Sequence, residues 1–333
     1  MPLDLVVPDL LLAAGAPPRL AAARLRHAEK WLARAEHALD PAAGTLAWLA
    51  AVHGLAEPAP YAAVALAGEG RDAAGDWLRA DPVHLRIDQD SVILHDASVL
   101  DLAREESDAL AATLRGHFAR DALTLDAVAP QRWYVRVPEG ELPVTVPLDR
   151  ANGHNVFGRL PKGGHRVNWP ALLTEAQMLL AEHAANAARE PAKPAANGVW
   201  FWGEGAALAS VERRYAIVHA REPFALGLAR LSGAEAREPP AAIADVDLVR
   251  AGESALVLLD ALTAPLHRGD EDAWIAAAEA LDERWFAGLE KAVERFGAVR
   301  LVLPLGERVR IATLTPSARW RWYRPRKPLA AHA

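Results

Sequence analysis

The hydrophobic and polar positions divide the chain into stretches of different texture. An apolar run over residues 3–7 stops at Pro8, which is typical of a buried strand that opens into a loop. Between residues 81 and 137, alternating segments surround an amphipathic one, and this pattern predicts a hairpin, a helix and a further strand. Beyond residue 197, apolar runs of strand length alternate with helical spacing. Such alternation predicts a mostly parallel sheet with helices on both faces.

The same patterns give approximate bounds for each element and for two domains. Helices are expected over residues 19–39, 45–53, 105–118, 171–188, 224–231 and 272–296. Strands are expected over residues 3–7, 83–87, 92–94, 132–137, 199–202, 215–219, 255–259 and 299–303. Residues 190–196 are rich in proline and predict a linker. We therefore expect a discontinuous α/β core over residues 1–78 and 197–333, interrupted by an inserted α+β domain over residues 79–196.

Composition narrows the class of protein. The 333 residues are 52% hydrophobic and 24% charged, which suits a folded protein of two domains. A net charge of -6 argues against nucleic-acid binding, and the lack of cysteine excludes disulfides and thiolate metal sites. No run reaches the ~18 uncharged apolar residues of a membrane helix, and the first residues lack the basic segment of a signal peptide. We expect a cytoplasmic protein with no membrane partner.

Four segments carry a resemblance to known proteins. ADPVHLRID, APQRWYVRV, EAQMLLAEHAAN and NGVWFWGEG, all between Ala80 and Gly205, resemble bacterial RpfE-type regulatory proteins. HNVFGRLPKGG and the segments after it resemble the archaeal-type cofactor-independent phosphoglycerate mutases of the alkaline phosphatase superfamily. The resemblance implies an alkaline phosphatase-like three-layer core with a mostly parallel sheet and an inserted α+β domain. Outside residues 81–205, it rests on the order and pattern of the elements.

The resemblance also implies a phosphoryl-transfer site with two divalent ions, held by Asp and His side chains beside a Ser or Thr nucleophile. Asp9 and His267 stand at ligand positions of that site. Thr45 lies near the nucleophile position; an N-cap of the following helix is the alternative role for it. The remaining positions are filled by residues that differ from the family pattern, namely Gly44, Thr263, Leu305, Gly306 and Leu314.

These replacements bear directly on metal binding. Leucine offers no lone pair to a cation, and two ligands cannot hold two hard dications that each need about four to six donors. We therefore expect the binuclear site to be absent and no cofactor to be resident. The alternative is a rebuilt site for a single Mn or Zn ion, made from Asp9, Asp260 and His267.

Other residues are candidates for ligand contact. The resemblance places the end of the helix before residue 190 at a cleft, so Asn186, Arg189 and Asn197 are selected for contact with an anion. Capping and linker hydrogen bonds are the alternative for these three. His154 is a candidate for a substrate groove, with a solvated surface histidine as its alternative. The basic and aromatic tail over residues 319–327 is interpreted as a terminal strand, with partner binding as the second interpretation.

Three functions follow, in order of preference. The first is a non-catalytic regulatory protein that binds a small phosphorylated metabolite or a protein partner. The second is an active phosphoglycerate mutase or phosphatase with a rearranged metal site. The third is an interaction module that uses the Trp- and Arg-rich C-terminal segment.

Overall fold

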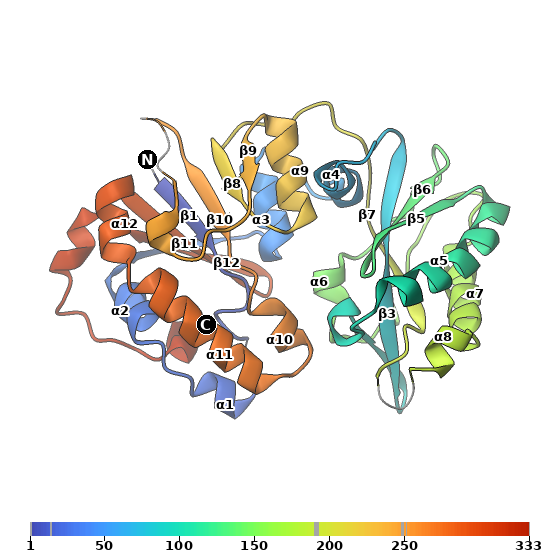
Figure 1. Ribbon diagram of the computed structural model, residues 1–333, viewed down its shortest axis with the longest axis horizontal. Coiled ribbons are helices and arrows are strands. Elements are labelled where there is room, and N and C mark those ends of the chain that lie inside the picture. Colours follow the sequence, from blue (N-terminus) through green and yellow to red (C-terminus); the bar gives the residue numbers. More distant parts are fainter. Residues whose placement is uncertain (1, 14, 190–192, 248–249, 251, 333) are drawn as a thin grey trace. The chain divides into compact units, whose positions relative to one another are not determined.

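The chain forms two compact units in a computed structural model that describes residues 2–13, 15–189, 193–247, 250 and 252–332 (Figure 1). The first unit comprises Met1–Ala56 and Ser210–Ala333, and the second comprises Glu57–Ala209. None of the helices in the described parts combines the length and the apolar character that a membrane span requires.

A seven-stranded sheet is the centre of the first unit. Strand β12 runs antiparallel to both of its neighbours, and the other described pairs in this sheet are parallel. The mostly parallel sheet expected from the sequence is therefore confirmed. Across the sheet the order is β2 (Glu36–Asp40), β12 (Arg308–Leu314), β11 (Ala298–Leu305), β1 (Pro2–Val6), β10 (Ala255–Leu258), β8 (Ile217–His219) and β9 (Glu235–Arg237).

Helices cover both faces of this sheet, which gives the three-layer arrangement (Figure 1). Successive side chains of a strand point to opposite faces. Leu3, Leu5 and Leu301 point to one face, where they join a buried core with residues of α2, α11 and α12. On the other face, α3 contacts β11 and β12, and α9 contacts β8 and β9. The helices of this unit are α1 (Pro18–Ala21), α2 (Arg26–Arg34), α3 (Gly44–Val52), α9 (Pro223–Ser232), α10 (Thr263–His267), α11 (Glu271–Leu281) and α12 (Leu289–Phe296), with short turns η3 (Ile243–Asp245), η4 (Asp282–Phe286), η5 (Pro316–Trp320) and η6 (Leu329–His332).

An antiparallel sheet organises the second unit, as expected for an α+β domain. Its path is β4 (Ser91–His95), β3 (Asp76–Asp88), β6 (Arg132–Val137) and β5 (Thr124–Ala129), and β7 (Gly198–Ala206) also pairs with β3. Residues of α5 and α7 join a buried core with one face of this sheet, and α4 contacts β3 and β7. The helices are α4 (Tyr61–Gly68), α5 (Arg104–Phe118), α6 (Leu148–Ala151), α7 (Trp169–Ala181) and α8 (Ala184–Ala187), with turns η1 (Ala97–Val99) and η2 (Ala119–Asp121).

The boundaries between the units differ from those expected at residues 79 and 196. Strand β3 begins at Asp76 and pairs along its first half with β7, so both strands belong to the second unit. The apolar run over residues 199–202 was expected in the core sheet and instead lies in β7. Its composition suits any buried strand, and its pairing partner is more than a hundred residues away.

Several helices are shorter than their expected ranges. The helix expected over residues 19–39 ends at Arg34, because residues 36–40 pair with β12. The helix expected over residues 171–188 is divided into α7 and α8, and His183 caps the second of these. A π-helical turn, η4, interrupts the helix expected over residues 272–296.

The two expectations for irregular segments have different outcomes. The tail over residues 319–327 contains the end of η5 and turns, so the expected terminal strand is wrong. Of the linker expected over residues 190–196, residues 190–192 lie outside the described residues.

Candidate functional site

The carboxyl ends of the parallel strands meet at one edge of the first unit's sheet, where open α/β sheets place their ligands. Asp9 follows β1 at this edge, and Asp260 follows β10. His219 is the last residue of β8 and is 2% exposed. The two acidic residues that the sequence selected are therefore at the edge where a site is expected.

Asp9 is held in an unusual backbone conformation. Its φ angle is +61°, in the left-handed region that side-chain-bearing residues seldom adopt. The indole Nε1 of Trp274 donates to the Asp9 carbonyl oxygen at 3.2 Å. The hydroxyl of Thr263, the first residue of α10, donates to Asp9 Oδ2 at 2.6 Å. Asp9 and position 263 are therefore in direct contact.

This contact gives one oxygen of the Asp9 carboxylate a hydrogen-bond donor without a cation. A carboxylate at position 263 would lie close to that of Asp9, and two adjacent carboxylates need a cation or a shared proton between them. A threonine hydroxyl is a donor and removes that need. The residues present at this point fit a hydrogen bond better than a metal bridge.

Three further positions of the expected metal site lie at two opposite edges of the sheet. Leu305 pairs with Arg308 across the β11–β12 turn, and Gly306 occupies that turn with a φ of +57°. Leu314 pairs instead with Val299 at the beginning of β11 and is fully buried. The expectation that Leu314 shares the carboxyl edge is wrong, because β12 reverses direction and carries it to the other edge.

The alternative single-metal set is not brought together. Burial raises the pKa of Asp260, while Arg221 opposes that rise and Glu238 adds to it. Arg221 Nε and Glu238 Oε2 are themselves paired at 2.6 Å. In the described part of the chain, the one group of three His, Asp or Glu side chains within ligand reach of each other lies elsewhere, so Asp9, Asp260 and His267 form no such group.

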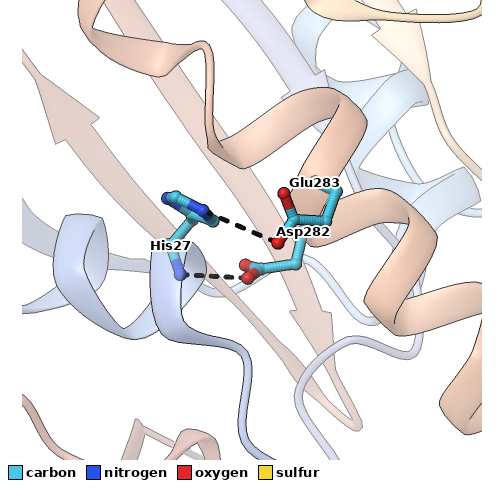
Figure 2. A group of neighbouring side chains, drawn as sticks. All are labelled: His27, Asp282 and Glu283. Carbon is cyan, nitrogen blue, oxygen red and sulfur yellow. Dashed lines mark hydrogen bonds and ion pairs between the residues drawn. The ribbon is translucent and has the colours of Figure 1, made fainter.

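That other group is His27, Asp282 and Glu283 (Figure 2). The two carboxylate oxygens of Asp282 accept from the backbone N–H groups of His27 at 3.0 Å and Ala28 at 2.7 Å, so they cap the first turn of α2. His27 Nε2 lies 3.8 Å from Glu283 Oε1 and accepts from Arg26 Nε at 3.1 Å. With a guanidinium beside it and both Asp282 oxygens in use, the group is explained as a helix cap.

Thr45 is the second residue of α3 and is partly buried. The N-cap position belongs to Ala43, so the N-cap role expected for Thr45 is wrong. The strand before it, β2, ends with Asp40 paired to Val309, at the carboxyl edge of the sheet. Strands β12 and β11 separate β2 from β1, which corresponds to roughly 14 Å between backbones at about 4.8 Å per strand.

The two asparagines that the sequence selected bind the chain's own backbone. Asn186 Nδ2 donates to the carbonyls of Leu180 at 2.7 Å and Ala196 at 3.0 Å, and its Oδ1 accepts from the Ala196 N–H at 2.9 Å. Asn197 donates to the Leu85 carbonyl at 3.0 Å and accepts from its N–H at 2.7 Å. These contacts agree with the capping alternative, and ligand contact by the two asparagines stays a prediction.

Arg189 has the same architectural role. Its Nε donates to the Pro194 carbonyl at 3.0 Å, Nη1 pairs with Glu106 Oε2 at 2.7 Å, and Nη2 donates to the Leu100 carbonyl. His154 is exposed, and its Nδ1 lies 2.9 Å from a backbone carbonyl two residues earlier. The structure thus gives Arg189 a structural function and places His154 on the surface.

Sequence reasoning missed a buried ion pair in the second unit. Asp81 Oδ1 accepts from Arg79 at 2.7 and 3.1 Å and from the Trp133 N–H at 3.2 Å, and its Oδ2 accepts from Trp202 Nε1 at 2.9 Å. The Arg79 guanidinium also lies over the rings of Tyr134 and Trp202, at 4.9 and 5.2 Å. Burial raises the pKa of Asp81, and Arg79 opposes that rise. The available signal was the pair of opposite charges at alternate positions within the buried, otherwise apolar residues 77–83 of β3.

A cavity of about 400 Å³ in the first unit was also missed. Its lining combines residues near position 35, residue 310 and the C-terminal segment: Leu32, Ala33, His37, Arg310, Arg324, Pro325, Lys327, Ala331 and His332. The basic tail was the available signal, but its interpretation as a strand directed attention away from a pocket.

Of two similar solved structures, the PH0037 protein supports the architecture. The PH0037 protein from Pyrococcus horikoshii aligns with a TM-score of 0.51 and 15% identity, over 94% of this chain and 87% of that chain. The cofactor-independent phosphoglycerate mutase from Thermoplasma acidophilum DSM 1728 aligns with a TM-score of 0.43 and 18% identity, over 95% of this chain and 90% of that chain. No family model and no curated protein matches the chain. At such identities a likeness concerns the fold, and function has to be argued from the site.

Proposed function

We propose that this protein is a non-catalytic, RpfE-type binding protein with a regulatory role, built on the scaffold of the cofactor-independent phosphoglycerate mutases. The observation that carries the proposal is the hydrogen bond from the Thr263 hydroxyl to Asp9 Oδ2, at the carboxyl edge of the core sheet. The resemblance implies metal-ligating aspartates at positions 9 and 263. This chain has Thr263 at the second position, and its hydroxyl donates to Asp9 instead of binding a metal.

The surrounding residues support the same proposal. Two-metal phosphoryl transfer depends on closely spaced ions that clamp the attacking and leaving oxygens. Leu305 brings an apolar, partly buried side chain to the carboxyl edge. Asp9, Asp260 and His267 are not grouped within ligand reach of each other. The residues present do not fit a binuclear centre, so we derive no catalytic step through one.

The C-terminal segment supports a second proposal, namely that the protein also binds a protein partner. Trp320, Trp322 and Tyr323 are 66%, 71% and 68% exposed, and such aromatic side chains are enriched at protein interfaces. The Arg319 guanidinium lies 4.9 Å from the centroid of the Trp320 ring, and the rings of Trp322 and Tyr323 pack edge to face.

Metal analysis together with an activity assay tests the first proposal. Protein purified without chelators is analysed for Mn and Zn, and interconversion of 3- and 2-phosphoglycerate is followed with either metal added. We expect less than stoichiometric metal and no interconversion above a protein-free control. Stoichiometric metal with turnover that is lost in Asp9→Ala would establish the competing function, an active mutase with Thr45 as its candidate nucleophile.

A further inference from the structure

The cavity introduced above has a strongly basic lining. Arg310, Arg324 and Lys327 contribute three fixed positive charges, and His37 and His332 contribute two imidazoles; we call these five residues the basic pocket. None of the nine residues that line the cavity is acidic. The lining comes from α2, β2, β12 and the C-terminal segment, and α2 and η6 contact each other (Figure 1).

The fold holds these groups in position. Arg310 is in the middle of β12, paired with Leu303 of β11 on one side and Leu39 of β2 on the other. Arg324 Nη1 donates to the Ala35 carbonyl at 3.0 Å, beyond the end of α2. The rings of His37 and His332 stack with centroids 6.0 Å apart. A ligand would therefore meet an arrangement that is largely pre-formed, which reduces the ordering that binding requires.

Two nitrogens of the basic pocket have unmet hydrogen-bonding capacity. Arg310 Nε and His332 Nε2 are buried and have no hydrogen-bond partner among the described residues. Buried polar groups are paired in most proteins, so an unmatched group calls for an explanation such as a bound water or ion. An oxyanion beside these nitrogens would supply the missing acceptor.

The lining residues themselves do not balance the positive charge of the pocket. Burial lowers the pKa of both histidines; Arg310 and Arg324 lower that of His37 further, and Arg310 and Lys327 lower that of His332. The one acidic residue that acts on His332 is Glu29, whose two oxygens already accept from Arg24 at 2.6 and 2.8 Å. None of the lining residues therefore supplies an anion to the cavity.

We propose that the basic pocket binds a small phosphorylated metabolite through its phosphate or pyrophosphate group. Arginine guanidinium groups match phosphate oxygens with paired, charge-assisted hydrogen bonds, and lysine adds a compact charge. A volume of about 400 Å³ falls within the usual range for small-molecule sites and leaves room beyond one phosphate group. The proposal deepens the proposed binding function, but it shares no lining residue with the Asp9 edge and does not depend on the loss of catalysis there.

The test is a calorimetric titration of the full chain with sodium pyrophosphate in EDTA, at constant ionic strength. The chelator prevents binding through a metal ion. Failure of this test is therefore distinguishable from failure of the metal analysis and the mutase assay, which test the proposed function. We expect saturable binding and a parallel rise in melting temperature, since a ligand that prefers the folded state stabilises it. Parallel arms with inorganic phosphate and with a phosphorylated sugar distinguish a free-phosphate site from a metabolite site.

Matched variants assign the binding to the basic pocket. Lys327→Ala removes one exposed charge from the pocket, and Lys291→Ala removes the same charge from α12 outside it. We expect Lys327→Ala to weaken pyrophosphate binding by about tenfold or more, as for loss of a charge-assisted contact, and Lys291→Ala to bind as the unaltered chain does. Arg310→Gln, with its melting temperature as a folding check, should weaken binding further.

Three results would overturn the proposal. One is the absence of saturable pyrophosphate binding. The second is equal weakening of pyrophosphate binding by Lys327→Ala and Lys291→Ala, which would indicate non-specific electrostatic attraction to the protein surface. The third is tight binding of a single-stranded oligonucleotide with no binding of the small phosphates, which would assign the surface to nucleic acid.

Discussion

The ion pair of the second unit and the basic pocket of the first both contain arginine side chains, but they differ in how far their hydrogen bonds are satisfied. Asp81 uses both carboxylate oxygens for Arg79, Trp133 and Trp202. In the basic pocket, Arg310 Nε and His332 Nε2 have no partner among the described residues. A closed network of this kind specifies a core, whereas an open one leaves capacity for a ligand.

The Asp9–Thr263 contact stands between these two extremes. One oxygen of Asp9 accepts from Thr263, and the side chain is only partly buried. Its left-handed backbone retains the strain that often accompanies functional sites, although the ligand set around it is incomplete. The comparison predicts that substitutions will cost most stability in the closed network and least in the open pocket.

Asp81→Ala should give the largest effect, a loss of about 3–5 kcal/mol in the free energy of unfolding. The substitution leaves the Arg79 cation buried without its partner, which costs more than the net value of the pair. Urea denaturation followed by tryptophan fluorescence measures it. Asp88→Ala, on the exposed end of the same strand, is the control and should change stability by less than about 0.5 kcal/mol. Similar losses in both variants would contradict the closed network.

Asn186→Ala should cost about 2–3 kcal/mol, because it leaves the carbonyls of Leu180 and Ala196 and the Ala196 N–H without their partner. The exposed His154, a second residue selected as a ligand contact, is the comparison. His154→Ala should change the free energy of unfolding by less than about 0.5 kcal/mol. A stable Asn186→Ala with reduced affinity for a phosphorylated ligand would restore the ligand role that the sequence suggested.

Local periodicity predicted some elements well and long-range pairing poorly. Helix α5 and strand β6 match their expected ranges because their patterns are clear over many residues. Strand β2 was missed because its side chains are mostly exposed and its sequence continues a helical pattern; its backbone is fixed by β12, far along the chain. The assignment of β7 to the wrong sheet has the same cause.

The sites show the same contrast. Asp9 and Asp260 could be found because each follows a predictable strand, and the carboxyl ends of parallel strands share one edge. The basic pocket could not, because His37, Arg310 and Lys327 come from three distant segments. For Asn186 the sequence left ligand contact and capping hydrogen bonds both open, because the backbone carbonyls that use its amide belong to Leu180 and to Ala196 beyond the end of α8.

Thr263→Val tests the Asp9–Thr263 contact and should lower the free energy of unfolding by about 1.5 kcal/mol. This is the lower end of the range for a hydrogen bond to a charged group, because the contact is partly exposed. Thr263→Asp places a second carboxylate against Asp9 and should destabilise the protein in EDTA through like-charge repulsion. Added Mn or Zn should raise the melting temperature of Thr263→Asp and leave that of Thr263→Val unchanged. A metal response in the unaltered chain equal to that of Thr263→Asp would show that position 263 does not control metal binding.

The smallest expected effect is a change of stability with pH. It concerns the two histidines of the basic pocket and not the Arg79–Asp81 pair. The pKa values of His37 and His332 are lowered from 6.5, with burial as the largest cause, so the unfolded chain binds protons that the folded chain does not. Their contribution to stability is therefore complete above pH 6.5 and is lost as the pH falls below it. Arg310, Arg324 and Lys327 also favour the neutral imidazoles. The hydrogen bond between His37 and the Leu32 carbonyl raises the pKa of His37, and Glu29 raises that of His332.

A bound oxyanion would reverse this balance, because negative charge beside the two imidazoles favours their protonated forms. The melting temperature should fall from pH 7.5 to pH 5.5 without ligand, and saturating pyrophosphate should reduce that fall. A His37→Gln, His332→Gln double variant should lose most of the difference between the two curves, whereas Asp88→Ala should retain it. If pyrophosphate raised the melting temperature by the same amount at every pH, its charge would lie away from these imidazoles. The unpaired nitrogens of the pocket would then need another occupant.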